Sequence, residues 1–212
     1  VCPGVSLARV HGYGRTGAGV TLLVGASWGA LRLASGVELA QADFVMNNGV
    51  EVSSLDPAAI TGQPEGRMAY ALFEGLVGKD PRTLEPIPGV AAAWDISADG
   101  LSYRFYLRPD ALWTNGEAAT AEDFRASFER FLDPRTAAPY AQQLWCVRGA
   151  REFATDVDSA GAPRRSFSSV SLRALDPLTL EIGLVSPTAY FLDLLGFYAL
   201  LPVHCKSLAM AR

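Results

Sequence analysis

The sequence is poor in the residues from which metal and catalytic sites are usually built. It has two histidines, His11 and His204, and three cysteines, and it contains no Cys-x-x-Cys pair. No spacing of these residues is typical of a zinc site. The Gly-x-Ser-x-Gly motif of serine hydrolases and the Walker phosphate-binding loop are also missing. The sequence therefore favours a binding protein over an enzyme, and no cofactor is expected.

An excess of basic charge is also missing. The chain carries 18 basic and 22 acidic residues, a net charge of −4, and its lysines and arginines are scattered. A nucleic acid or an anionic membrane surface is usually bound by a basic patch, so we expect neither as the main partner. With 212 residues, of which 50% are hydrophobic and 19% charged, the chain has the composition of a globular protein. Its length suits one large or two small domains.

The apolar run near the start of the chain is too short for a comfortable transmembrane helix. It covers residues 18–31 and is broken by glycines, whereas a membrane span needs about 20 apolar residues. Arg9 and Arg15 precede it, and Ala40-Gln41-Ala42 follows as a small-residue cleavage pattern. This order predicts a secretory signal over residues 1–42, and hence a periplasmic or cell-surface protein. An unrelated leader or a misassigned start is the alternative.

The three cysteines do not define a disulfide framework. Cys2 lies in the leader-like segment, whereas Cys146 and Cys205 each lie among apolar residues. In an oxidising compartment these two could pair. Free, buried thiols are the other interpretation, because an unpaired cysteine behaves as a small apolar residue.

From residue 43 onward, strand-like and helix-like hydrophobic patterns alternate without repeats. Asp99-Gly100 between two alternating segments predicts a hairpin with a type I′ turn. Thr120, with Asp123 three residues later, predicts a capped helix. The full set of predicted elements is a strand at 44–52, helices at 65–77, 120–132 and 189–196, hairpins at 94–107 and 170–184, and a polar surface loop at 151–169. The fold class is mixed α/β (α+β), with too few crossovers for a doubly wound sheet.

Acidic pairs and aromatic residues each have a structural and a functional interpretation. Glu122 and Asp123 could be proposed as an acid–base pair, but a capping role explains acids in the first turn of a helix. Glu74 is expected to be solvated or paired. The aromatic residues could form a stacking platform, although their spacing favours the core; they are Trp94, Trp113, Trp145, Phe105, Phe124, Phe128 and Phe131.

Several motifs follow one another in an order that resembles a known family. Asn47-Asn48-Gly49 precedes Ser54-Leu55-Asp56-Pro57, and Phe73-Glu74-Gly75-Leu76 ends a helical pattern. Trp113-Thr114-Asn115-Gly116 and the segment 132–141 come later. Over residues 44–205, this order resembles the extracytoplasmic solute-binding proteins of family 5, in particular the oligopeptide-binding receptors of ABC importers. The chain is similar to an N-terminal fragment of such a receptor.

The resemblance implies a partial periplasmic-binding-protein-like fold. Residues 43–63 would start lobe I, residues 64–187 would form an inserted α+β subdomain, and residues 188–212 would return into lobe I. The first lobe would be incomplete and the second lobe missing. The resemblance also implies a monomer that delivers oligopeptides to the membrane permease of an ABC importer.

The resemblance assigns Glu51, Val52, Ser53 and Tyr140 to the peptide site, and no metal ligand. The main chain of Val52 and Ser53 would pair with an extended peptide as an added strand, which suits peptides of any sequence. Glu51 would face a side-chain pocket that holds water, and the Tyr140 hydroxyl would bind a ligand carbonyl. The alternatives are a solvated acid for Glu51 and a packing role for Tyr140.

Other functions remain open at this point. A receptor of the same superfamily could bind dipeptides, nickel or haem. A chaperone-like module that binds unfolded segments is a further alternative. An enzyme would need a nucleophile or a metal cluster that this sequence does not show.

Overall fold

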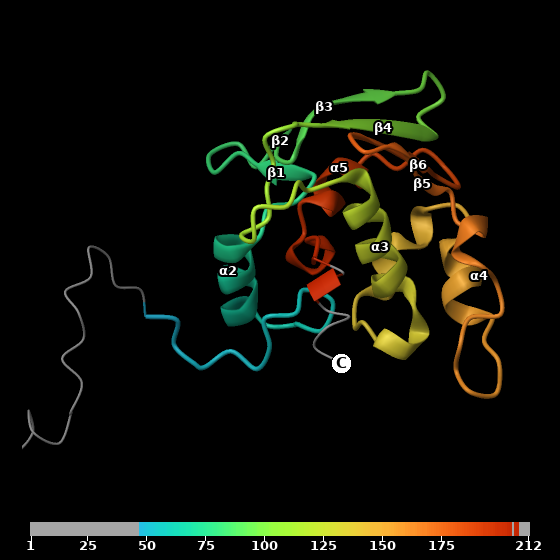
Figure 1. The fold of residues 1–212 in the computed structure, drawn as a ribbon, viewed down its shortest axis with the longest axis horizontal. Helices are drawn as coiled ribbons and strands as arrows, with labels where there is room; N and C mark the ends of the chain where they lie inside the picture. Colours follow the sequence, from blue (N-terminus) through green and yellow to red (C-terminus); the bar gives the residue numbers. More distant parts are fainter. Residues whose placement is uncertain (1–46, 205, 208–212) are drawn as a thin grey trace, which may run out of the picture. The chain divides into compact units, whose positions relative to one another are not determined.

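Residues 47–204 and 206–207 are described by the computed structural model, in which helices lie on one side of antiparallel strands (Figure 1). No helix in this part of the chain is long and apolar enough to cross a membrane. The helices and strands are α2 (Gln63–Leu72), β1 (Val77–Lys79), β2 (Pro86–Pro88), β3 (Ala91–Ile96), β4 (Ser102–Leu107), α3 (Ala121–Leu132), α4 (Ala150–Thr155), β5 (Leu172–Asp176), β6 (Thr179–Gly183) and α5 (Phe191–Leu195). The 3-10 helices are η1 (Pro134–Thr136), η2 (Ala141–Cys146), η3 (Phe167–Ser169) and η4 (Tyr198–Leu200).

The four-stranded sheet has the order β3-β4-β6-β5, and β1 pairs with β2 separately. Side chains alternate between the faces of a strand, and in β4 the buried set is Tyr103, Phe105 and Leu107. These residues face the core, in which α3 packs against β5 and β6 (Figure 1). Both predicted hairpins are confirmed, β3 with β4 and β5 with β6.

The turn between β3 and β4 differs from the prediction. A type I′ turn needs positive φ at both central residues, but of the two only Gly100 has it, at +68°. The Asp99 carboxylate instead accepts a hydrogen bond from the Leu101 N–H, at 3.0 Å, and from the Ser97 hydroxyl, at 2.5 Å. The side chain of Asp99 thus organises a longer loop, and the two-residue turn was the wrong prediction.

The outer face of this sheet carries a row of alternating charges. Strand register places Asp95 opposite Arg104, Arg104 opposite Glu181, and Glu181 opposite Arg173. The Arg104 guanidinium donates to the Glu181 carboxylate at 2.9 Å. Opposite charges on facing positions stabilise a sheet modestly and keep its face polar, so this side of the sheet faces solvent.

Helix α3 confirms the predicted capped helix. The Asp123 carboxylate accepts from the Thr120 N–H at 2.9 Å and from its hydroxyl at 2.8 Å, which closes a capping box. Phe124, Phe128 and Phe131 form its buried stripe. Asp123 therefore caps a helix, as the capping interpretation predicted.

Helix α2 is shorter than the predicted helix at 65–77. It ends at Leu72, and Phe73 is already extended, with φ −125° and ψ 153°. The chain then turns because Gly75 and Leu76 pair with a neighbouring segment: the Val90 N–H donates to the Gly75 carbonyl at 2.9 Å. Sheet pairing therefore overrides the helical pattern after Leu72.

The predicted strand at 44–52 is wrong over its described part. Residues 47–54 contain no strand, and residues 44–46 lie outside the described residues. A strand needs a neighbour to satisfy its main chain, and none of the described strands pairs with this segment. Its residues bond to the start of α2 instead.

The polar segment 151–169 is also more ordered than predicted. It contains most of α4 and all of η3. Phe153 and Phe167 are buried and meet edge-to-face, with ring centroids 5.2 Å apart. This aromatic pair anchors a segment whose composition suggested a surface loop. The helix predicted at 189–196 is confirmed in a shorter form, α5.

Most of the aromatic residues belong to the core, as their spacing indicated. The phenylalanines at 105, 124, 128 and 131 are buried, whereas Trp145 is 37% exposed. The Cys146 thiol is free and half-buried, and burial raises its pKa. Cys2 and Cys205 lie outside the described residues.

Candidate functional site

The segment before α2 folds back onto the start of that helix. The Asn48 side chain donates to the Pro64 carbonyl at 3.2 Å, and Arg67 donates to the Asn48 side-chain oxygen at 3.4 Å. The N–H and the hydroxyl of Ser53 both donate to the Glu65 carboxylate, at 3.2 and 3.0 Å. These bonds hold residues 48–53 beside the first turn of α2.

The structure places three predicted site residues on this segment. Glu51 and Ser53 are exposed, and Val52 is half-buried. Among the described residues, none forms a hydrogen bond with the main chain of Val52. The Ser53 N–H, by contrast, is engaged by Glu65. The Ser53 N–H is therefore occupied within this segment, whereas the main chain of Val52 is not.

Tyr140 reaches the same end of α2 from a distant part of the chain. Its hydroxyl donates to the Thr61 carbonyl at 3.1 Å, and the Tyr198 hydroxyl donates to the same oxygen at 3.1 Å. The Tyr140 ring lies edge-on to Phe197, with centroids 5.1 Å apart. Tyr140 thus packs against Phe197, and its hydroxyl is bonded to the Thr61 carbonyl.

The exposed backbone next to Tyr140 is a feature that the sequence interpretation missed. Gly62, the N-cap of α2, is extended, with φ −92° and ψ 159°, and has no side chain to cap the helix. Thr61 and Gln63 on either side are exposed. Pro64 has no N–H, the Gly66 N–H donates to the Gly62 carbonyl at 3.0 Å, and the Glu65 N–H lies against its own carboxylate, so most donors of this first turn have local partners. A glycine shortly before a proline at the start of a helix was the available sequence signal.

The tyrosines around this segment are held close by small residues. A Cβ on Gly66 would lie 2.8 Å from the Tyr198 ring, so glycine is needed for α2 to pack there. Burial and the neighbouring Tyr140 hydroxyl raise the pKa of Tyr198 to about 12, and burial raises the pKa of Tyr70. Both phenols remain neutral hydrogen-bonding groups at neutral pH.

The carboxylate of Glu65 should titrate below its usual range. Its own N–H, then the N–H and hydroxyl of Ser53, lower its pKa from 4.5. A lowered pKa in the folded state adds stability above the unfolded value, and this is lost as pH falls through the folded value. We expect Ser53→Ala to raise the Glu65 pKa, as measured by carboxyl carbon NMR titration. Ser168→Ala is the control, and an unchanged Glu65 pKa in Ser53→Ala would contradict the assignment.

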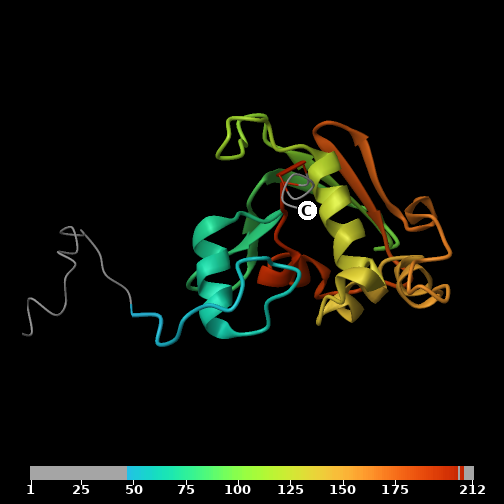
Figure 2. The ribbon, with the colours of Figure 1, turned by 60° about the horizontal axis from the view of Figure 1, so that its bottom comes forward.

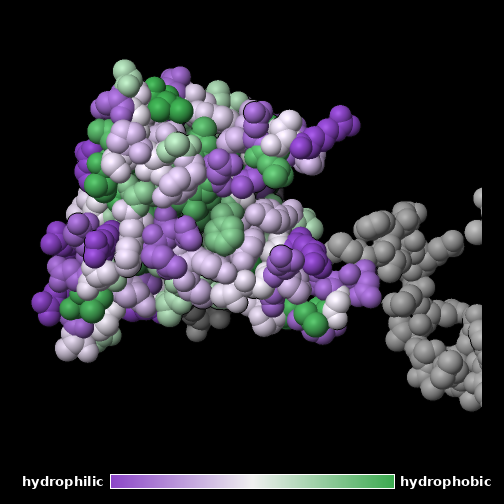
Figure 3. All heavy atoms as spheres, turned by 180° about the vertical axis from the view of Figure 1, so that it is seen from behind, coloured by the Kyte–Doolittle hydropathy of each residue, from purple (hydrophilic) through white to green (hydrophobic). Residues whose placement is uncertain are grey.

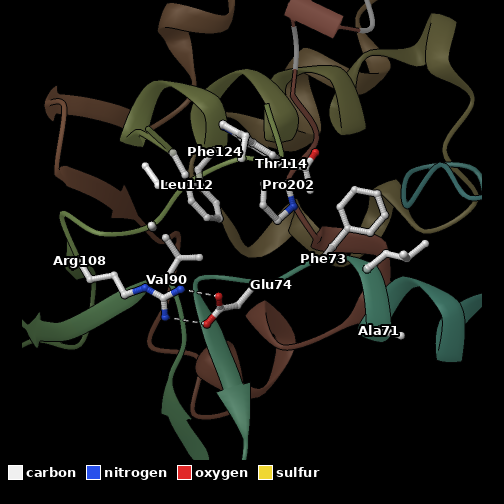
Figure 4. Close-up of a pocket in the computed structure, with 13 residues that line it drawn as sticks. Ala71, Phe73, Glu74, Val90, Arg108, Leu112, Thr114, Phe124 and Pro202 are labelled. Carbon is white, nitrogen blue, oxygen red and sulfur yellow. Dashed lines mark hydrogen bonds and ion pairs between the residues drawn. The ribbon is translucent and has the colours of Figure 1, made fainter. Parts of the chain in front are cut away.

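A hollow of about 300 Å³ lies at the opposite end of α2 (Figure 4). On its rim, the Arg108 guanidinium donates to both oxygens of the Glu74 carboxylate, at 2.7 and 3.0 Å, so Glu74 is paired. Phe73 and Pro202 lie across from Leu112 and Phe124 in Figure 4. The full lining is Ala71, Leu72, Phe73, Glu74, Val90, Arg108, Ala111, Leu112, Trp113, Thr114, Ala119, Phe124 and Pro202.

Within the described residues, no group of three or more His, Cys, Asp or Glu side chains could hold a metal ion. Polar and apolar side chains are interspersed on the face seen in Figure 3. The class of protein follows from comparison with known families. Residues 85–210 match the family described as bacterial extracellular solute-binding proteins, family 5 middle, and the chain belongs to this family.

Similar proteins and solved structures also support membership of this family. The chain is 40% identical over 170 residues to the periplasmic oligopeptide-binding protein OppA of Escherichia coli. The aligned residues cover 80% of this chain and 30% of that protein. The structure of Haemophilus influenzae OppA in complex with RPPGFSPFR matches with a TM-score of 0.71 and 34% identity, covering 77% of this chain and 31% of that one. The fold is therefore a partial one of this type, and the chain spans about a third of these relatives.

Proposed function

We propose that this chain is part of an exported oligopeptide receptor that delivers peptides to the permease of an ABC importer. The observation that carries the proposal is the 40% identity to an oligopeptide-binding protein over 170 residues. A structural neighbour in complex with a nonapeptide supports the same ligand class. The absence of a metal-binding cluster among the described residues fits a receptor better than an enzyme.

The peptide site in this proposal lies at the amino end of α2. It comprises Glu51, Val52, Ser53 and Tyr140, together with the backbone of Thr61 and of the extended Gly62. An extended peptide would pair with this main chain as an added strand, so that binding does not depend on its side chains. Pairing at Ser53 would first have to displace Glu65, which now accepts its N–H.

Tyr140 has a hydroxyl that can change partner at little cost. It donates to the Thr61 carbonyl, which also accepts from Tyr198. If Tyr140 turned to a ligand carbonyl, Tyr198 would keep the Thr61 oxygen satisfied. Thr61 is at an exposed position, where water can also take the place of a lost hydrogen bond.

In the whole receptor, the remainder of the protein would supply the opposite wall of the site. Residues 43–63 and 188–212 would belong to lobe I, and residues 64–187 would form the inserted subdomain. The receptor would be a monomer with two lobes, and its second lobe would close over the peptide. Closure would shift the population towards a closed form that the permease recognises. The leader at residues 1–42 would direct export.

The 212-residue chain alone is expected to bind peptides only weakly, because it offers one wall of the site. Calorimetry with a panel of tri- to pentapeptides should show no submicromolar binding. Joining the chain to the part of E. coli OppA that follows the matched region should restore binding. Submicromolar binding by the 212 residues alone would contradict this architecture.

Tyr140→Ala should weaken peptide binding in the restored receptor. One hydrogen bond contributes about 0.5–1.5 kcal/mol, which corresponds to about a 2- to 13-fold increase in Kd. Tyr140→Phe separates the hydroxyl from the ring, and Tyr190→Ala, at an exposed position, is the control. An unchanged Kd in Tyr140→Ala would remove Tyr140 from the site.

A dipeptide ligand is the second candidate, because the chain is 33% identical over 163 residues to the dipeptide-binding protein DppE of Bacillus subtilis. Mass spectrometry of small molecules that co-purify with the restored receptor separates the candidates. Longer peptides support the proposal, and dipeptides, nickel or haem point to another receptor of the superfamily. Unfolded protein segments would indicate the chaperone-like alternative.

A further inference from the structure

The carbonyl oxygen of Thr61 accepts hydrogen bonds from two phenols that come from distant parts of the chain. The Tyr140 hydroxyl and the Tyr198 hydroxyl both donate to it, each at 3.1 Å. A backbone carbonyl oxygen has two lone pairs, and these two donors occupy both. A main-chain N–H of a bound peptide could therefore bond to this oxygen only after one of the phenols has left it.

Tyr198 is the more firmly held of the two phenols. It belongs to η4, which lies beside α2 (Figure 2). A Cβ on Gly66 would lie 2.8 Å from the Tyr198 ring, so the ring packs directly on the backbone of α2. The rings of Phe197 and Tyr70 lie on other sides of it, with centroids 4.3 and 6.0 Å away. Close packing of this kind leaves the ring little room to turn, so its hydroxyl stays on Thr61.

Tyr140 has more freedom to change its partner. It is the N-cap of η2, and its ring meets those of Phe197 and Tyr198 only edge-on. In the proposed peptide site its hydroxyl turns to a ligand carbonyl, and one lone pair of the Thr61 oxygen then becomes free. An extended peptide carries N–H groups as well as carbonyls along its edge and can donate to that lone pair. One exchange thus leaves Thr61, Tyr140 and the ligand all with partners.

We propose that Tyr198 is a positioning residue of the peptide site, whose hydroxyl keeps the Thr61 carbonyl in place while Tyr140 exchanges that oxygen for the ligand. The lone pair that Tyr140 leaves accepts a peptide N–H. Because Tyr198 holds this backbone before the ligand arrives, less ordering is needed on binding. The inference rests on the proposed function, since it concerns the same site.

The carbonyl carbon of Thr61 reports directly on this contact in the 212-residue chain. Tyr198→Phe removes the hydroxyl and keeps the ring, so the Thr61 carbonyl resonance in a carbon NMR spectrum should move upfield as the oxygen loses a donor. Tyr70→Phe is the matched control, because the Tyr70 hydroxyl donates to the Gly196 carbonyl at 3.0 Å and its ring meets that of Tyr198. It should move the Gly196 resonance and leave that of Thr61 in place. An unmoved Thr61 resonance in Tyr198→Phe would overturn the proposal.

Peptide affinity is measured by calorimetry in the joined receptor, with tetra-alanine as the probe because it offers little besides main chain. Tyr198→Phe should raise Kd by about 2- to 13-fold, the effect of one hydrogen bond, whereas Tyr70→Phe should change it less than about twofold. Circular dichroism establishes that each protein is folded at the temperature of the titration. If the part from E. coli OppA does not fold, the counterpart from Salmonella typhimurium, whose OppA is 39% identical to this chain, replaces it.

The outcomes separate this inference from the proposed function. A Kd that rises in Tyr140→Ala but not in Tyr198→Phe would overturn the role of Tyr198 and leave the peptide site standing. A Kd that changes in neither variant, or no binding of any peptide by the folded receptor, would overturn both. Equal rises in Tyr198→Phe and Tyr70→Phe would show a packing effect of the whole aromatic group, and this too would overturn the positioning role.

Discussion

Replacement of Phe105 by alanine is expected to lower the free energy of unfolding by about 3–5 kcal/mol, the range for removing a buried phenylalanine. Phe105 is 0% exposed and lies in β4, between β3 and β6. Its ring contacts Tyr103 and Trp94, with centroids 6.3 and 6.4 Å away. The loss combines the transfer of the ring to water with the cavity left in the core. The neighbours sit in paired strands and cannot collapse into that space.

Tyr106→Ala is the matched control, one residue further along the same strand. Tyr106 is 37% exposed on the outer face, and its hydroxyl donates to the Asp95 carboxylate at 2.7 Å. A cross-strand contact of this kind contributes about 0.2–1 kcal/mol. Urea unfolding of the 212-residue chain, followed by circular dichroism, measures both variants. Equal losses for the two would show that β4 does not separate a core face from a solvent face.

The elements that the sequence predicted well are those fixed by near neighbours in the chain. The capping box of α3 needs only Thr120 and Asp123, three residues apart. The two hairpins need alternating segments close to a turn, and Tyr103, Phe105 and Leu107 show that alternation. Such signals survive in a single sequence because the partner is a few residues away.

The errors concern elements whose partners are distant or lie outside the described residues. Leu76 and Val77 continue the helical pattern of α2, but Leu76 pairs with Ala91 across a sheet contact that the pattern does not reveal. Val50 and Val52 flank Glu51 as in a strand, yet none of the described strands pairs with residues 47–52. At Leu76, tertiary pairing and not local propensity decides the structure.

The candidate site also combines features fixed by near neighbours in the chain with contacts between distant residues. Tyr140 was named from a resemblance, but its contact with Thr61 joins residues 79 apart in the sequence. No spacing rule predicts such a contact. The exposed backbone at Gly62 could have been noticed from the glycine and proline around the helix start. Only the fold shows that Tyr140 and Tyr198 meet there.

Gly149→Ala is expected to be the most damaging single-methyl change considered, with a loss of about 2–5 kcal/mol from backbone strain and overpacking together. Gly149 is the N-cap of α4 and has φ +82°, in the left-handed region that favours glycine. A Cβ there would lie inside van der Waals contact of the Ser169 carbonyl oxygen and 3.2 Å from Val170 Cα. Both neighbours are backbone, so neither can turn away.

Gly161→Ala isolates the contribution of backbone strain, and its difference from Gly149→Ala gives the steric contribution. Gly161 has φ +77°, but a Cβ there would meet nothing within 4 Å. It should therefore cost only the strain of the left-handed backbone, about 1–2 kcal/mol. Chemical denaturation of both variants gives the difference, and equal losses would show that the segment at Ser169 and Val170 yields to the added methyl. Of the two helices nearby, only η2 lies between Tyr140 and Gly149, and a larger loss for Gly149→Ala would show that the Ser169–Val170 backbone holds the end of that segment firmly.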